Sequence, residues 1–240
     1  MYSKTAQWYD ALYRFKEYQA EAEQITARIR AEHPDARTIL DVGCGTAEHD
    51  RFLTQEYQVD GLDITPDFVR IAAAKNPAGR YFCADMADFS LPMHYDVILC
   101  LFSAIGYVKT LARLVDALVC FRCHMNPGGI ILVEPWFTPE TFHPEEKVYL
   151  LTGENDQGKI CRMNVSRCEG RLSILDFHYL LGTAAGIEYL TERHELGLFT
   201  EREMLEAFAQ AGLAVSHDPE GLTGRGLYTA RAIAHPPGRR

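Results

Sequence analysis

The chain has 240 residues, 47% of them hydrophobic, and a formal net charge of −9, which is ordinary for a globular protein of one large domain or one domain with an insertion. The acidic balance argues against a non-specific nucleic-acid surface, which is normally basic. No apolar run approaches the roughly 18 residues of a membrane span and no signal-peptide core opens the chain, so we expect a cytoplasmic protein with neither a nucleic-acid nor a membrane partner.

The first half of the chain alternates between helical and strand patterns. Apolar residues at helical spacing predict a first helix over residues 4–32, which Pro34 ends. Short apolar runs bounded by turn residues predict buried strands at 38–42, 58–63, 80–83, 95–101 and 130–134. Further helices are predicted at about 47–57, 65–76 and 110–125. Strands that alternate with helices indicate βαβ units and a parallel sheet.

The pattern changes after Pro135. Stretches of β character separated by glycine-containing turns follow at 147–152, 159–168, 171–181 and 187–197, which predicts an antiparallel meander with one solvated face. A capping box at 200–203 then opens a helix to about 210, and strands are predicted at 213–217 and 226–233. We therefore predict an α/β fold: a doubly wound, Rossmann-like domain of residues 1–140 and 198–240, with residues 141–197 inserted as an antiparallel β flap over the substrate site.

The seven cysteines do not form a metal-binding pattern. Cys120 and Cys123 have CxxC spacing, but no second pair with zinc spacing follows them. Cytoplasmic thiols stay reduced, and buried helix cysteines are the commoner interpretation. We expect no metal site.

A nucleoside-binding site is predicted where consecutive strands end. Gly43 and Gly45 follow the first strand and let the backbone turn sharply and approach a ligand closely; ligands of open α/β sheets bind at this edge. Asp63 ends the second strand, where its carboxylate can accept both hydroxyls of a ribose. Asp85 ends the third strand and can accept an adenine amino group, with Met86 packing on the ring.

The fourth strand end and the glycine loop narrow the choice of cofactor. Leu101, Phe102 and Ser103 would form a wall of the same site. A nicotinamide dehydrogenase would need G-x-G-x-x-G around a pyrophosphate, but Glu48 stands at the position of the third glycine and would repel it. S-adenosylmethionine (SAM) has no phosphate and carries a positive sulfonium, so an acidic loop favours SAM.

At these motifs the chain resembles the class I SAM-dependent methyltransferases. More narrowly, it is similar to the enzymes that N,N-dimethylate the amino group of dTDP-linked deoxyamino sugars in macrolide antibiotic pathways, and the resemblance covers nearly the whole chain. The matching stretches are Tyr9-Asp10, Lys16-Glu17-Tyr18, 40–46, 61–63, 85–89, 102–107, 127–129, 133–136, 198–200 and 224–227. The early motifs are generic to class I, whereas Glu134-Pro135-Trp136 and Gly224-Arg225-Gly226-Leu227 are narrower.

The resemblance implies a role for each matching position. SAM would be bound by Tyr9, Lys16, Asp41, Gly43, Cys44, Gly45, Thr46, Asp63, Ile64, Asp85, Met86, Leu101, Phe102 and Ser103. Tyr9 and Lys16 would lie near its methionine part. Tyr2 and Tyr107 would face the amine as catalytic residues. The sugar nucleotide, a small-molecule acceptor, would contact Trp136, Ser166, Arg167 and Arg225, since arginine suits phosphate oxygens.

The chain departs from the family at Ala47, which replaces a usual glycine, at Phe137, which replaces a second tryptophan, and in a shorter segment between Tyr9 and Lys16. A neutral amine is already a good nucleophile, so the enzyme has mainly to align it and exclude water. Three alternatives stay open: N- or O-methylation of another small metabolite, SAM binding without catalysis, and a nicotinamide enzyme. A homodimer formed through exposed strand edges of the flap is a further expectation.

Overall fold

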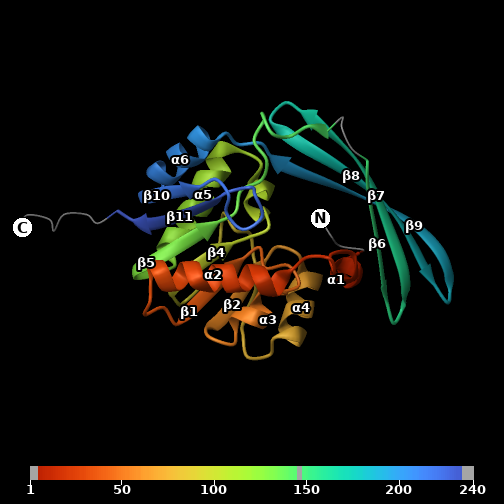
Figure 1. The fold of residues 1–240 in the computed structure, drawn as a ribbon, viewed down its shortest axis with the longest axis horizontal. Helices are drawn as coiled ribbons and strands as arrows, with labels where there is room; N and C mark the ends of the chain where they lie inside the picture. The colour runs from red at the N-terminus through yellow and green to blue at the C-terminus, as the bar shows by residue number, and fades with distance from the viewer. Residues whose placement is uncertain (1–4, 145–147, 234–240) are drawn as a thin grey trace, which may run out of the picture.

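The computed structural model describes residues 5–144 and 148–233 and contains two sheets (Figure 1). The larger sheet has seven strands in the order β10-β11-β5-β4-β1-β2-β3. Their bounds are Thr38–Val42 (β1), Gln58–Asp63 (β2), Tyr81–Cys83 (β3), Tyr95–Cys100 (β4), Met125–Val133 (β5), Leu213–Asp218 (β10) and Leu227–Ala232 (β11). β1 to β5 pair in parallel, and β11 runs antiparallel to both neighbours. The predicted wound α/β sheet is confirmed.

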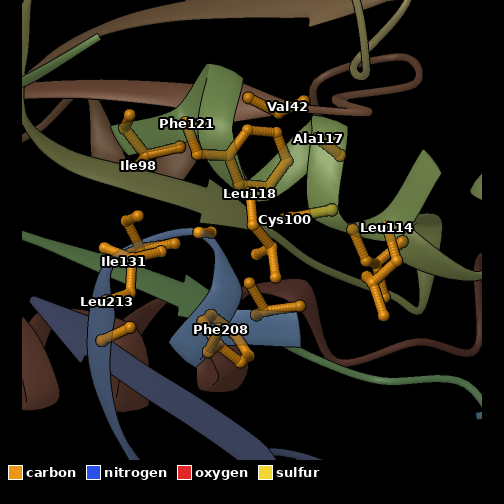
Figure 2. Packing of buried hydrophobic residues seen from close by; sticks show 14 of the residues in the cluster. Val42, Ile98, Cys100, Leu114, Ala117, Leu118, Phe121, Ile131, Phe208 and Leu213 are labelled. Atoms are coloured by element: carbon orange, nitrogen blue, oxygen red, sulfur yellow. The ribbon is translucent and has the colours of Figure 1, made fainter. Parts of the chain in front are cut away.

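Helices cover both faces of this sheet (Figure 1). One face packs on α5 (Leu111–Cys123) and α6 (Glu201–Gln210), and the other packs on α2 (Tyr18–Glu32) and α3 (Asp50–Leu53). Along β4, Ile98 and Cys100 point to the first face, while Val97 and Leu99 point to the second. All four side chains are fully buried, as expected of a central parallel strand. Figure 2 shows the α5 and α6 side of the core.

The predicted helix over residues 4–32 is divided into η1 (Ala6–Trp8), α1 (Tyr9–Leu12) and α2. Trp8, Leu12 and Tyr13 are buried against the second sheet instead of continuing one helical stripe. The predicted helix over 47–57 shortens to α3, because Ala47 adopts a left-handed φ of 60° that a helix cannot include. The helix predicted at 65–76 forms as α4 (Pro66–Lys75). The predictions for residues 4–32 and 47–57 were therefore wrong in extent, and both segments lie near the glycine loop.

The second sheet is antiparallel and has the order β6-β7-β8-β9, which we call the flap. Its strands are Tyr149–Asn155 (β6), Gly158–Glu169 (β7), Leu172–Thr183 (β8) and Gly186–Gly197 (β9). It projects from one end of the wound domain, with α1 between them (Figure 1). Side chains that face each other across its strands, such as Arg162 and Tyr179, or Leu175 and His194, share the inner face, which packs on η1 and α1.

No helix in the described part of the chain is long and apolar enough to cross a membrane. Among residues 5–144 and 148–233, no group of three or more His, Cys, Asp or Glu side chains is arranged to hold a metal ion.

Candidate active site

The loop after β1 lies at the point where strand order reverses between β1 and β4, the place where open α/β sheets bind ligands. Gly43 has a φ of 78°, and a Cβ there would come within 2.6 Å of the Cβ of Ala104. Gly45 has a φ of 55° and faces open space. The backbone N–H of Gly43 donates to the carbonyl of Leu62 at 2.7 Å, which attaches the loop to β2. Both glycines are therefore needed, one for a close approach and both for their backbone conformation.

Asp63 is held in place at the end of β2. Its carboxylate accepts the backbone N–H of Gly45 at 3.0 Å and that of Thr65 at 2.8 Å. Burial raises the pKa of Asp63, and the two backbone hydrogen bonds oppose that rise. Each carboxylate oxygen keeps a lone pair beyond these bonds. The group is thus preorganised to accept two further hydroxyl donors from the cavity that it lines.

A cavity of about 1070 Å³ lies between the strand ends and the inner face of the flap. It brings together thirteen of the residues predicted from the sequence: Tyr9, Gly43, Gly45, Asp63, Ile64, Asp85, Met86, Leu101, Phe102, Tyr107, Trp136, Ser166 and Arg225. Its volume is at the upper end for a small-molecule site, which suits a cofactor together with a second ligand.

Six predicted residues do not line this cavity: Lys16, Asp41, Cys44, Thr46, Ser103 and Arg167. Thr46 donates to Asp10 at 2.5 Å, and Ser103 donates to the carbonyl of Pro135 at 2.7 Å. Lys16 pairs with Glu21, with its ammonium 4.4 Å from the ring of Phe102. Thr46, Ser103 and Lys16 therefore contact residues of the surrounding structure and do not face the cavity itself. Tyr2, the other predicted catalytic residue, lies outside the described residues.

Arg167 pairs with Asp176 and with Glu169 on the flap. Neighbouring residues on a strand point to opposite faces, and Arg167 lies on the face of the flap that carries Asp176. Ser166 lines the cavity.

The acidity beside the glycine loop comes from strand ends and not from Glu48. The Glu48 carboxylate pairs with Lys75 at 2.5 Å and with Arg51 at 2.9 Å, and it does not line the cavity. Asp63 and Asp85 do line it. Asp85 accepts Arg113 at 2.6 Å and the N–H of Ala87 at 2.9 Å. The carboxylates that face the cavity beside the glycine loop are therefore Asp63 and Asp85, of which Asp85 is paired with Arg113.

The turn at the end of β4 is strained and is held by a buried carboxylate. Phe102 and Ser103 adopt left-handed φ values of 49° and 63°, which cost free energy for residues other than glycine. Glu134, at the end of β5, has no exposed surface. Its Oε2 accepts the backbone N–H of Phe102 at 2.6 Å, and its Oε1 accepts the hydroxyl of Thr223 at 2.5 Å. This arrangement fixes Phe102 as a wall of the cavity.

Arg225 lines the cavity among aromatic rings. Its guanidinium is 5.6 Å from the ring of Phe102 and 5.9 Å from that of Trp136. Its Nε donates to Thr223 at 3.3 Å and lies 3.7 Å from Glu134. In the described part of the chain its Nη1 and Nη2 have no hydrogen-bond acceptor, so both can bind an anion in the cavity.

The inner face of the flap contributes residues that the sequence interpretation missed, notably Arg162, Asn164, Phe177 and His194. Arg162 is almost fully buried, donates to the hydroxyl of Tyr13 at 2.9 Å and lies 4.2 Å from the ring of Phe177. Strand alternation counted from Ser166 places residues 162 and 164 on the same face, so the sequence could have predicted both as cavity residues.

Tyr107, from the short helix η2 (Ala104–Val108), joins the cavity to the flap. Its hydroxyl is hydrogen-bonded to Nδ1 of His194 at 2.9 Å. Nearby, the indole N–H of Trp136 donates to Ser173 at 2.8 Å. The wound domain and the flap therefore meet through polar contacts beside the cavity.

Comparison with known proteins agrees with this geometry. Residues 39–129 match the family model described as a methyltransferase domain. The chain is 37% identical to the dTDP-3-amino-3,6-dideoxy-alpha-D-glucopyranose N,N-dimethyltransferase of Streptomyces fradiae, over 93% of this chain and 89% of that protein. The fold matches the crystal structure of Streptomyces venezuelae DesVI with a TM-score of 0.88, at 33% identity over 95% and 98% of the two chains.

A SAM-bound structure is similar as well. CalS10, an amino pentose methyltransferase from Micromonospora echinaspora, matches with a TM-score of 0.80 at 34% identity, over 90% of this chain and 92% of that one. The glycine loop, the preorganised Asp63 and these relatives lead to the same conclusion: SAM is the cofactor, and the chain belongs to the class I SAM-dependent methyltransferases, among relatives that include the dTDP-amino-sugar N,N-dimethyltransferases.

Proposed function

We propose that this methyltransferase methylates the amino group of a nucleotide-linked deoxyamino sugar. The observation that carries the proposal is Arg225, which lines the cavity and whose Nη atoms have no hydrogen-bond acceptor among the described residues. In a chain of net charge −9, an arginine on a cavity wall is suited to a bound diphosphate. The Streptomyces fradiae relative named above is an N,N-dimethyltransferase of a dTDP-linked amino sugar, and this chain spans 89% of its length.

Each end of the cavity has a separate task in this proposal. SAM supplies an electrophilic methyl group when bound. Asp63 accepts the ribose hydroxyls, and Phe102 with Met86 excludes water. Arg225, Trp136 and Ser166 hold the sugar nucleotide, and Tyr107 orients the amine. Alignment of the amine and exclusion of water account for most of the rate enhancement.

The test is a methylation assay with SAM and a panel of acceptors, followed by mass spectrometry. The panel contains a dTDP-linked 3-amino sugar, the corresponding 3-hydroxy sugar nucleotide, and the free amino sugar without its nucleotide. We expect mass gains of one or two methyl groups on the first acceptor alone. Transfer to the hydroxy sugar would point to O-methylation. Equal transfer to the free amino sugar would show that the enzyme does not need the nucleotide, and it would contradict the proposed role of Arg225.

We also propose that the protein forms a homodimer through the outer face of the flap. Strand pairing places the exposed side chains of Leu150, Met163, Val165, Leu180 and Tyr189 on this face. Contiguous exposed apolar patches mark interaction sites, and two-fold symmetric dimers are the commonest assemblies. Light scattering should give twice the chain mass, and the double variant Met163→Lys, Leu180→Lys should give a monomer. A monomeric wild type at micromolar concentration would contradict this proposal.

A further inference from the structure

Methylation of an amine has a proton requirement that the proposed alignment does not meet. An unsubstituted aliphatic amine such as that of lysine has a pKa of about 10.4. The hydroxyl groups beside the amino group of a sugar lower this pKa by induction, but part of such an acceptor still reaches the cavity at pH 7 as an ammonium ion. An ammonium nitrogen has no lone pair with which to attack a methyl group. The protonated acceptor therefore has to lose a proton, to solvent or to a group in the cavity, before it can react.

A connected set of polar groups leads from the cavity into the flap. The hydroxyl of Tyr107, on the cavity wall, is hydrogen-bonded to Nδ1 of His194 at 2.9 Å. Nε2 of His194 lies 3.6 Å from Oε2 of Glu192, two residues earlier on the same face of β9. That oxygen accepts the hydroxyls of Thr5 at 3.0 Å and Tyr179 at 3.2 Å. A phenol, an imidazole and a carboxylate thus follow one another.

His194 and Glu192 are more deeply buried than Tyr107, so a proton from the acceptor enters the set at Tyr107. Tyr107 is half-buried at the cavity, whereas His194 and Glu192 are 1% and 8% exposed. The imidazole ring packs 4.7 Å from the ring of Phe177, which fixes its orientation. A proton that enters at Tyr107 passes to a ring whose far nitrogen faces a carboxylate. The same order of groups orients and stabilises a histidine base in hydrolases.

We propose that Tyr107, His194 and Glu192 form a proton relay that deprotonates the ammonium group of the acceptor. The proposal rests on the function proposed above and adds two positioning residues that act through Tyr107. The ammonium N–H bond breaks, its electron pair stays on nitrogen, and the proton bonds to the Tyr107 oxygen. The Tyr107 hydroxyl proton moves to Nδ1 of His194. The nitrogen is then free to form a bond to the methyl carbon, while the carbon–sulfur bond of the donor breaks with its electron pair on sulfur and S-adenosylhomocysteine leaves. His194 is buried, so the imidazolium returns its proton through the hydroxyl of Tyr107 to the cavity after transfer.

The charges around His194 agree with this role. Burial lowers the pKa of His194, and Arg162 from β7 lowers it further, whereas the Glu192 carboxylate opposes both. Three phenols also lie on this side of the flap: Tyr107 from η2, Tyr179 from β8, and Tyr13, which accepts a hydrogen bond from Arg162. The imidazole is therefore neutral at pH 7 and can accept a proton.

The test is the pH profile of the variant His194→Asn with a nucleotide-linked amino sugar as acceptor. An asparagine amide can still contact Tyr107, but it cannot take up a proton. We expect kcat at pH 7 to fall about tenfold to a hundredfold, the usual effect of losing acid–base catalysis, with KM for SAM unchanged. The loss should shrink to about threefold or less at pH 9.5, where more acceptor arrives as the free amine. Glu192→Gln should show a smaller loss with the same pH trend.

The flap offers a matched control. His178 is hydrogen-bonded through Nδ1 to the hydroxyl of Tyr189 at 2.5 Å, so it forms the same pair of groups on the outer face. His178→Asn should leave kcat and its pH profile unchanged, once light scattering shows the same assembly as the wild type. The shift in melting temperature caused by S-adenosylhomocysteine checks that each variant folds and binds cofactor.

Two results would overturn the relay in different ways. A loss in His194→Asn that is equal at pH 7 and pH 9.5, or no loss at all, overturns the relay while the proposed function stands. A wild type that methylates no amino sugar overturns both proposals together.

Discussion

The backbone N–H of Phe102 donates to the buried carboxylate of Glu134 at 2.6 Å, which ties the end of β4 to the end of β5. The same carboxylate accepts the hydroxyl of Thr223, close to Arg225, so one side chain supports two parts of the cavity wall. The Glu134-Pro135-Trp136 motif therefore holds the structure together as well as supplying an indole to the cavity lining.

Glu134→Ala should destabilise the protein by about 2–4 kcal/mol, because the change leaves the N–H of Phe102 and the hydroxyl of Thr223 without their acceptor in a buried site. Glu134→Gln keeps an acceptor for one of them and should cost less. Urea denaturation measures both variants. Equal stability of the alanine variant and the wild type would mean that the turn at Phe102 does not depend on the Glu134 carboxylate.

Asp63→Asn should weaken SAM binding about tenfold to a hundredfold, since a charged acceptor of two ribose hydroxyls becomes a neutral amide with one acceptor atom. Titration calorimetry with SAM and with S-adenosylhomocysteine measures the change. Asp67→Asn is the matched control, because Asp67 carries the same charge on α4 and pairs with Arg70 in solvent. Similar losses in both variants would attribute the effect to net charge and not to contact.

The strand ends of the wound domain could be predicted from the sequence because local signals determine them. Gly43, Asp63 and Asp85 each follow a short apolar run, and parallel strands bring such ends to one edge. Glu48 shows the limit of this reasoning. Its charge is evident in the sequence, but its pairing with Lys75 depends on how α4 packs.

The part of the cavity next to the flap was harder to predict because it is built where the flap meets η1, α1 and η2. His194 is far from Tyr107 in the sequence, and only the docking of the two sheets brings them within 2.9 Å. Packing against the flap also breaks the helix predicted over 4–32, since Trp8 and Tyr13 turn toward Tyr179. Strand alternation could have separated Ser166 from Arg167, because it needs no knowledge of packing.

Arg225→Ala should raise KM for a nucleotide-linked acceptor about tenfold or more and leave KM for SAM unchanged, because the lost group faces the acceptor part of the cavity. Arg167→Ala should change neither by more than about twofold, since its guanidinium pairs with Asp176 and Glu169 away from the cavity lining. Steady-state kinetics with each substrate varied in turn separates the two arginines. A large effect of Arg167→Ala, with none of Arg225→Ala, would show that Arg167 and not Arg225 contacts the phosphates.

Two buried carboxyls, Asp41 and Asp50, lie behind the glycine loop and are joined by a hydrogen bond. Burial raises the pKa of Asp50 to about 6, although the hydroxyl of Tyr81 donates to it at 2.9 Å. Burial and the neighbouring Asp50 also raise the pKa of Asp41. Two like charges cannot share this site without cost, so the pair is most stable when it holds a proton.

The sign of the pH effect follows from proton binding. In the unfolded chain an aspartate titrates near 3.9, so between about pH 4 and pH 6 the folded protein binds more protons at Asp50. The free energy of unfolding therefore falls as pH rises through this window and stays lower above it. Asp50→Asn mimics the protonated form and keeps an acceptor for Tyr81. It should match the wild type near pH 4 and exceed its stability by about 1–3 kcal/mol at pH 8. Urea denaturation at both pH values measures the difference, and an advantage that does not grow with pH would show that Asp50 is ionised at little cost.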